Sequence, residues 1–417
     1  MARAARVSDF LGLTRNTVGM LFMVILVGMG EKMAERFLPI YLLALGGGVL
    51  SIGLLNGMDN LLSALYSFPG GYLSDRVGIK RALVIFNIVA MCGFLVVIIF
   101  PAWQAVLLGA VLFISWSAIS LPATMSLIAK VLPMTKRTMG VSMHSLVRRI
   151  PMAVGPVLGG LCIGIWGVRG GVRAAFVAAL LLSFLAIVLQ HKLIEDELPQ
   201  QPGEECPYLP EKNPLKLYRL MAPNLRRLLA SDILVRYCEQ IPYAFVVVWC
   251  MKTISSPVSA LQFGILTSIE MATAVLVYVP VAYLADKTTK KPFVVMTFVF
   301  FTLFPLTLLF CRSFNWLVLA FILRGFKEFG EPTRKALIMD LAPEDCKAGM
   351  FGLYYLVRDV FVSIAAFGGA FLWQISPATN FLAAFSCGVI GTLGFAFFGS
   401  DFPELEFRHK SLNIESN

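Results

Sequence analysis

GGYLSDRVGIKR, at residues 70–81, has a second and altered copy about 210 positions later, VAYLADKTTKKP at residues 281–292. Each copy follows a long apolar run and combines small residues with an aspartate and basic residues. Other matches keep a similar shift: they pair Pro122 with Pro332, Pro133 with Pro343, residues 146–148 with 356–358, Gly159 with Gly369, and Asp59 with Glu270. Because chance does not produce so many matches in register, we interpret the chain as one unit duplicated.

The composition indicates which solvent surrounds this chain. Hydrophobic residues make up 58% of its 417 residues and charged residues 14%, whereas globular chains average about 45–50% and about 25%. Too little polar surface exists to cover a water-soluble protein of this size. The same balance excludes a disordered chain, a collagen, a coiled coil and a disulfide-rich secreted module. We therefore expect an all-α polytopic membrane protein.

Apolar segments long enough to cross a bilayer, which takes about 20 residues, occur twelve times in this chain. We expect transmembrane helices near residues 17–45, 49–73, 82–100, 103–129, 139–166, 173–191, 228–252, 258–284, 292–311, 314–338, 349–375 and 379–400. A stretch rich in Pro, Glu and Lys separates two sets of six. The predicted domains are a six-helix bundle at 1–191, a cytoplasmic linker at 192–227 and a pseudo-symmetric six-helix bundle at 228–417, with the substrate between the bundles.

The basic residues predict the orientation of the chain in the membrane. With the N-terminus inside, the inner tails, loops and linker, together with Arg334 and Lys335 at the inner end of a span, hold 23 of the 35 Lys and Arg residues. The outer loops, together with Arg173 and Lys252 at the outer ends of spans, hold four. Positive charge concentrates on the cytoplasmic side of membrane proteins. We therefore predict a multi-pass protein of the plasma membrane (a bacterial inner membrane) with both termini in the cytoplasm. The net charge of +10 then reflects topology and not nucleic-acid binding.

The segment at residues 70–81 closely resembles the G-x-L-a-D-R-x-G-r-k-r signature between spans 2 and 3 of the major facilitator superfamily, and its copy lies where that family has a degenerate signature. The resemblance implies a twelve-span secondary transporter. It also implies a conformational latch that holds the two halves in the outward-facing state. The latch candidates are Gly71, Asp75, Arg76, Gly78, Arg81 and Asp286. The alternative is that the basic residues only mark the cytoplasmic side.

Two further segments resemble signatures of particular transporter groups. GPVLGG, at residues 155–160, resembles the G-x-x-x-G-P-x-x-G-G signature of drug–proton antiporters, with Pro151 in place of the first glycine. Close packing and bending of the helix explain the same residues equally well. AERF, at residues 34–37, resembles the E-x-x-E-R-F motif of proton-coupled peptide transporters, with Lys32 in place of the first glutamate. Drug efflux and peptide transport are therefore the alternative functions.

Ionisable side chains inside membrane spans are costly unless they are paired or face water, so they indicate function. Apart from the four basic residues at span ends that are counted with the loops, the spans hold eight basic and nine acidic residues, and structural ion pairs are the alternative for each of them. Guanidinium and ammonium groups bind carboxylate and phosphate, and the substrate-binding candidates are Arg36, Arg148, Arg236, Arg324, Lys327 and Arg358. Carboxyl groups in low dielectric can take up protons, and the proton-coupling candidates are Glu31, Glu35, Asp59, Glu239 and Glu270, with His144 as a weaker one.

The predicted function is secondary active transport of a small, polar and anionic organic solute by alternating access, coupled to protons. The chain has no G-x-x-x-x-G-K-[ST] phosphate loop, so an ion gradient is the expected energy source. Three scattered histidines, and eight cysteines without a C-x-x-C pair, argue against an enzyme, a metal site and a cofactor. We expect a monomer whose partners are the lipid bilayer, the small-molecule substrate and H⁺ as the coupling ion.

Overall fold

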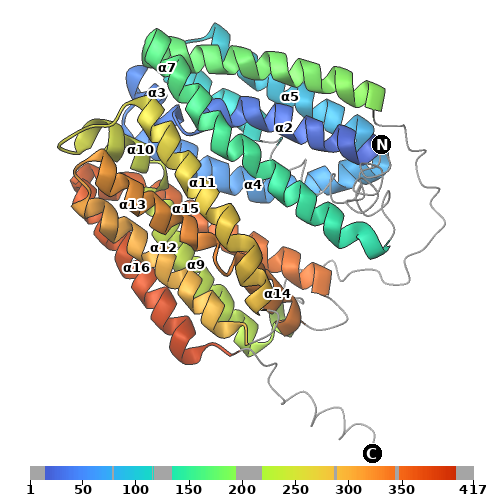
Figure 1. Cartoon of the computed structure of the whole chain (residues 1–417), viewed down its shortest axis with the longest axis vertical. Helices are drawn as coiled ribbons and strands as arrows, with labels where there is room; N and C mark the ends of the chain where they lie inside the picture. Colours follow the sequence, from blue (N-terminus) through green and yellow to red (C-terminus); the bar gives the residue numbers. More distant parts are fainter. Residues whose placement is uncertain are drawn as a thin grey trace, which may run out of the picture.

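Helices form the structure, a computed structural model that describes residues 15–77, 79–114, 116, 134–193, 218–285, 289–342 and 347–400. Within these ranges there is no β-strand. Figure 1 shows two groups of helices that pack side by side, one from the first half of the chain (blue to green) and one from the second half (yellow to red). The predicted all-α architecture in two bundles is confirmed.

The first bundle contains α2 (Arg15–Glu35), α3 (Leu38–Ala44), α4 (Val49–Val77), α5 (Ile79–Ile99), a shorter apolar helix (Trp103–Ile114) and α7 (Met134–Leu193). α7 contains both of the spans predicted at 139–166 and 173–191, because the chain turns back within it (Figure 1). The turn lies at Gly167, whose φ of 69° is a conformation that glycine adopts readily and other residues rarely adopt.

The second bundle is more interrupted than the sequence predicted. It contains α9 (Pro223–Tyr243), α10 (Val246–Val248), η1 (Trp249–Thr253), α11 (Ala260–Ala285), α12 (Lys291–Phe310), α13 (Phe314–Gly325), η2 (Phe326–Glu328), α14 (Glu331–Leu341), α15 (Lys347–Ile375) and α16 (Pro377–Phe398). The spans predicted at 228–252 and 314–338 are each broken into shorter helices. Pro242 precedes the first break, and Gly330 and Pro332 lie at the second. Both residue types weaken a continuous helix.

Six described helices are long and apolar enough to cross a membrane, or seven if the bent pair Pro223–Tyr243 and Val246–Thr253 forms one span. The other predicted spans are helical over their described residues but are charged, broken or short. α2 and α4 carry charged side chains, and α13 and α14 are separate helices. The remainder of the span predicted at 103–129, and linker residues 194–217, lie outside the described residues.

Each bundle contains a close contact between two of its own helices, and in both bundles this contact depends on a glycine. A Cβ atom on Gly159 of α7 would collide with the carbonyl oxygen of Met33 in α2. A Cβ atom on Gly369 of α15 would collide in the same way with the carbonyl oxygen of Ile241 in α9. Because Gly159 and Gly369 are equivalent in the internal repeat, the duplication extends to the packing of the helices.

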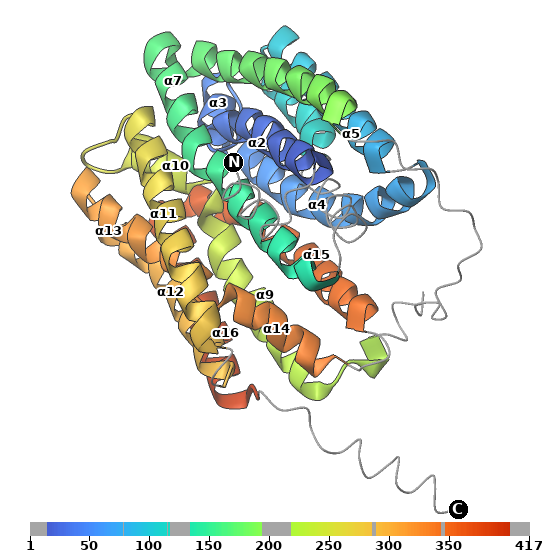
Figure 2. The same ribbon diagram turned by 45° about the vertical axis from the view of Figure 1, so that its right-hand side comes forward.

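Among the described helices, the bundles meet mainly along two pairs, α7 with α11 and α4 with α15. Figure 2 shows α11 beside α7 at this interface. Gly160 of α7 lies against the backbone of Ala260, and Gly53 of α4 lies against the side chain of Ala370. The GPVLGG segment therefore packs against helices of both bundles, which supports the packing interpretation of this segment.

The latch candidates lie where α4 is followed by α5. Gly71, Asp75 and Arg76 fall in the last two turns of α4, and Arg81 lies in the first turn of α5 with an exposed side chain. Gly78 and Asp286 lie outside the described residues, as do the side chains at 67–79. The latch therefore stays a prediction.

Candidate functional site

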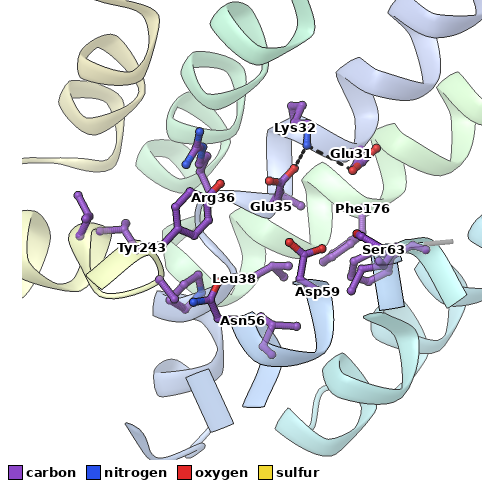
Figure 3. Close-up of a pocket in the computed structure, with 18 of the residues that line it drawn as sticks. Glu31, Lys32, Glu35, Arg36, Leu38, Asn56, Asp59, Ser63, Phe176 and Tyr243 are labelled. Carbon is purple, nitrogen blue, oxygen red and sulfur yellow. Dashed lines mark hydrogen bonds and ion pairs between the residues drawn. The ribbon is translucent and has the colours of Figure 1, made fainter. Parts of the chain in front are cut away.

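Side chains of both bundles line a cavity of about 220 Å³ between them. Its walls come from α2, α3, α4, α5, the Trp103–Ile114 helix and α7 on one side and from α9, α10, α11 and α13 on the other. The charged lining residues are Glu31, Lys32, Glu35, Arg36, Asp59, Arg148 and Arg324, and the aromatic ones are Phe94, Phe113, Phe176, Tyr243 and Phe263. Figure 3 shows part of this lining. Aromatic walls with a few convergent polar groups are typical of a small-molecule site.

Two helix breaks lie at the cavity, at equivalent places in the two halves. α2 ends at Glu35, and the turn at 36–37 leads into α3, which has Pro39 in its first turn. α9 ends at Tyr243, directly after Pro242, and the chain continues after a bend of 40°. Irregular backbone inside a membrane protein is tolerated where it is buried in protein or lines a cavity. Paired breaks of this kind point to the binding site of a transporter built from repeats.

Asparagine side chains donate hydrogen bonds to carbonyl groups at the break between α9 and α10. Asn56 of α4 donates from Nδ2 to the carbonyl oxygen of Gln240 at 3.0 Å, and Asn380 of α16 donates to that of Ile241 at 3.3 Å. Asn60 of α4 also donates to the side chain of Gln240 at 3.3 Å. The end of α9 is therefore held from both bundles, which fixes the position of Tyr243.

The charges at the end of α2 neutralise one another in part. Lys32 pairs with Glu35, one turn further along the helix, and its Nζ lies 3.4 Å from Glu31 Oε1 (Figure 3). One cation thus faces two carboxylates on the cavity wall. This cluster leaves the surface of α2 with a negative excess.

Three charged lining residues have no ion pair or hydrogen bond within the part of the chain that the structure describes: Arg36, Arg148 and Asp59. The guanidinium of Arg36 lies over the ring of Tyr243, with its Cζ 5.1 Å from the ring centroid. Asp59 is exposed within the cavity, and its carboxylate points toward Glu35 in Figure 3. These three groups are available to a solute.

The charges of the second bundle are paired instead. Glu270, which is 0% exposed, lies between Arg324 and Lys327, with its Oε1 at 3.3 Å from Arg324 Nε and 3.1 Å from Lys327 Nζ. Lys327 also pairs with Glu239 at 3.0 Å, and Glu239 pairs with Arg236 at 2.7 Å. Charges removed from water require such partners, because their desolvation is otherwise uncompensated.

The same network continues through the first turn of α14 to α15. Arg236 reaches Glu331 at 3.2 Å, and Arg334 pairs with both Glu331 and Asp232. Arg358 lies 3.7 Å from Asp232, and Tyr354 Oη donates to the same carboxylate at 3.0 Å. Arg358 also pairs with the neighbouring Asp359 at 2.7 Å. We call the chain of ion pairs from Glu270 to Asp359 the C-terminal charge network.

Among the described residues, one ion pair joins the two bundles directly. Arg149 of α7 donates from Nη2 to Glu328 Oε2 of η2 at 2.9 Å. Its neighbour Arg148 lines the cavity. Arg149 therefore faces the opposite bundle, whereas the adjacent Arg148 faces the cavity.

The structure brings six of the selected residues to the cavity and leaves five in the C-terminal charge network. Arg36, Arg148, Arg324, Glu31, Glu35 and Asp59 line the cavity, whereas Arg236, Lys327, Arg358, Glu239 and Glu270 do not. Lys327 and Glu239 line a second cavity of about 10 Å³ that Arg324 also borders. His144 lies in α7, and its side chain is outside the described residues.

Lys32, Tyr243 and Arg334 are among the residues of the site that were not selected from the sequence. Lys32 and Arg334 each have a glutamate three residues away, which was a signal of pairing within one helix. Tyr243 follows Pro242, a residue that predicts a helix break. Among the described residues, no group of three or more His, Cys, Asp or Glu side chains could hold a metal ion.

Comparisons with known proteins agree with this architecture. Residues 20–205 and 228–411 match the family model of the Major Facilitator Superfamily. An uncharacterized MFS-type transporter of Methanocaldococcus jannaschii is 25% identical over 398 residues, which cover 91% of this chain and 94% of the relative.

Solved structures of transporters show the same fold. A POT family transporter in complex with 5-aminolevulinic acid matches with a TM-score of 0.77 at 13% identity, over 92% of this chain and 96% of that chain. A mutant of the nucleoside transporter NupG matches with a TM-score of 0.74 at 14% identity, over 92% of this chain and 99% of that chain. At these identities the likeness concerns the fold and not the solute.

Proposed function

Because this chain belongs to the major facilitator superfamily and is a membrane transporter rather than an enzyme, we propose that it carries a small organic anion across the plasma membrane together with protons, by alternating access. The observation that carries this proposal is that two arginines on the cavity wall have no carboxylate partner among the described residues. Arg36 and Arg148 line the cavity without an ion pair within the described residues, although carboxylates lie on the same walls. A guanidinium without a partner favours an anionic solute, which it can bind through two parallel hydrogen bonds.

Proton coupling is supported by the carboxylates of α2 and α4 that line the same cavity. Asp59 faces Glu35, and Glu31 lies one turn before Glu35 on α2. Carboxylates that share a site of low dielectric are not all ionised at once, because like charges repel. A proton taken up here offsets the charge that an anion brings, so that solute and proton enter together. Glu239 and Glu270 are weaker candidates because each already pairs with two cations.

The helix contacts support an inward-facing state. Gly53 and Gly160 make their close contacts to the opposite bundle near the ends of spans that the basic residues place outside. A carrier that is sealed at the outer side presents its cavity to the cytoplasm. In this state the latch residues Gly71, Asp75, Arg76, Gly78, Arg81 and Asp286 would be disengaged.

Drug–proton antiport is the second candidate function. The aromatic wall, with the rings of Phe94, Phe113 and Phe176 packed at centroid distances of 5.7–5.8 Å, favours it because such rings hold apolar solutes. Growth of an efflux-deficient host that expresses the protein, tested on a panel of dyes and antibiotics, distinguishes it. Broad resistance would favour antiport over anion uptake.

The experiment that tests the proposed function is uptake into proteoliposomes with an imposed pH gradient. A thermal-shift screen of organic acids, sugar phosphates and peptides first selects the solute, because a bound ligand stabilises the folded state by mass action. We expect the selected acid to accumulate when the compartment it leaves is more acidic. Uptake that follows a sodium gradient and ignores the pH gradient would contradict proton coupling. Stabilisation by peptides alone would favour the peptide alternative.

A further inference from the structure

One arginine of each bundle lies near the ring of Tyr243, the last residue of α9. The Cζ atom of Arg36, from the first break, lies 5.1 Å from the ring centroid of Tyr243, at the second break. The Cζ atom of Arg324, from α13, lies 5.6 Å from the same centroid. All three residues line the central cavity. We call Arg36, Tyr243 and Arg324 the junction site.

The charges around this ring are not balanced. Arg324 has a carboxylate partner in Glu270 at 3.3 Å, and its guanidinium also lies 4.9 Å from the ring centroid of Phe304. Arg36 has the ring of Tyr243 but no ion pair among the described residues. An aromatic face attracts a cation, but unlike a carboxylate it supplies no opposite charge. Two guanidiniums lie at this ring beside the single carboxylate of Glu270, and the nearby Glu35 pairs with Lys32, so the junction site has a positive excess.

An anion placed at the junction site would remove that excess. The hydroxyl group of Tyr243 makes no hydrogen bond within the described residues, and it is able to donate one to an oxyanion. Arg36 supplies a planar fork of donors whose geometry matches carboxylate and phosphate. The pairing between Glu270 and Arg324 keeps the second guanidinium in place without an incoming ligand.

We propose that the junction site binds the oxyanion of the substrate, a carboxylate or a phosphate group, and that Tyr243 determines specificity by holding the guanidiniums of both bundles at one ring. This inference rests on the proposed anion transport and adds where the anionic group binds. Because Arg36 belongs to the first bundle and Tyr243 and Arg324 to the second, the bound anion contacts both bundles. Binding is thereby connected to their relative movement.

The test measures anion binding to the purified full-length protein at constant ionic strength. Succinate and inorganic phosphate are the two probes, and they separate a carboxylate site from a phosphate site. Tyr243→Phe keeps the ring and removes the hydroxyl, Tyr243→Leu removes the ring, and Arg36→Lys keeps the charge and removes the fork. Tyr237→Phe is the matched control, because Tyr237 lies on the same helix α9 but does not line the cavity.

We expect Tyr243→Leu to weaken binding of the preferred probe by about tenfold or more, since a desolvated cation–aromatic contact and its hydrogen bond are both lost. Tyr243→Phe and Arg36→Lys should weaken it by about threefold to tenfold, and Tyr237→Phe should leave it unchanged. If Tyr243→Leu does not yield a folded protein, Tyr243→Phe and Arg36→Lys test whether the junction site binds the anion.

The outcomes distinguish the location of the site from the proposed function. Unchanged binding in the Tyr243 and Arg36 variants, together with its loss in Arg148→Gln, would overturn the junction site and leave anion transport standing. Absence of saturable binding of any organic or inorganic anion to the unmodified protein would overturn both. Equal weakening of an uncharged solute and of the anion by Tyr243→Leu would also contradict an oxyanion site.

Discussion

Asp59 and Glu270 are equivalent in the internal repeat, as are Arg148 and Arg358, yet their surroundings differ between the two bundles. Glu270 is fully buried between Arg324 and Lys327, and Arg358 lies beside Asp232 and pairs with Asp359. Asp59 and Arg148 line the cavity without ion pairs among the described residues. The duplication therefore preserved the positions of the charges and not their partners. The second bundle uses them to hold its helices together, and the first leaves them open to a solute.

The largest expected effect is loss of a member of the C-terminal charge network. Arg334→Met removes a side chain that is 1% exposed and pairs with Asp232 and Glu331. Breaking a buried pair strands the remaining carboxylates, which costs about 3–5 kcal/mol. We expect a large fall in the melting temperature of the purified protein. Arg148→Gln is the control and should melt close to the unmodified protein, because no described residue pairs with Arg148. If Arg334→Met and Arg148→Gln lower the melting temperature equally, the two bundles do not differ in how far their charges contribute to stability.

The second prediction concerns what the bundles have in common. Gly159→Ala and Gly369→Ala each place a Cβ atom against a carbonyl oxygen of the neighbouring helix, in α2 and α9 respectively. Overpacking of a close contact costs about 1–3 kcal/mol, so both variants should melt at lower temperature, and by similar amounts. Gly164→Ala is the matched control in α7, because a Cβ atom there meets no neighbour. If Gly159→Ala lowers the melting temperature and Gly369→Ala does not, the duplication extends to the sequence but not to the packing of the helices.

The sequence predicted the bundles and the charged spans, but not which charges would find partners. Composition and apolar segment length were sufficient for the fold, because both follow from burial in lipid. Pairing depends on how helices are rotated against one another, and this rotation is set by contacts such as that of Gly159 with Met33. Arg236 and Arg358 were therefore predicted as substrate ligands on the same grounds as Arg36, although the structure places them in ion pairs. Their role in binding stays a prediction.

The sequence contains a partial signal for the helix breaks between α2 and α3 and between α9 and α10. Pro39 and Pro242 signal an interruption, but the apolar runs around them read as continuous spans. The contact of Arg36 with Tyr243 required the structure, because it joins residues 207 positions apart from different bundles.

The third prediction separates binding from stability in the first bundle. Arg148→Gln should weaken binding of the transported anion by about tenfold to a hundredfold, because a charge-assisted hydrogen bond contributes about 1.5–3 kcal/mol. Uptake in proteoliposomes, measured against solute concentration, reports this loss as a raised KM. Lys335→Gln is the control, since Lys335 is exposed on α14 away from the cavity. An Arg148→Gln carrier with unchanged KM would exclude Arg148 from the anion site.

The prediction with the smallest free energy concerns the coupling of transport to protons, and it compares Asp59 with its repeat equivalent. Asp59→Asn should abolish accumulation driven by a pH gradient, since one coupled proton supplies about 1.4 kcal/mol, or tenfold accumulation, per pH unit. Exchange of labelled for unlabelled solute without a gradient should persist, because the arginines that we propose to bind the anion remain. Glu270→Gln should instead lower the melting temperature, because it leaves Arg324 and Lys327 without their shared carboxylate. If Glu270→Gln uncouples transport and Asp59→Asn does not, the proton is carried by the paired acid of the second bundle, and the division of roles between the bundles is reversed.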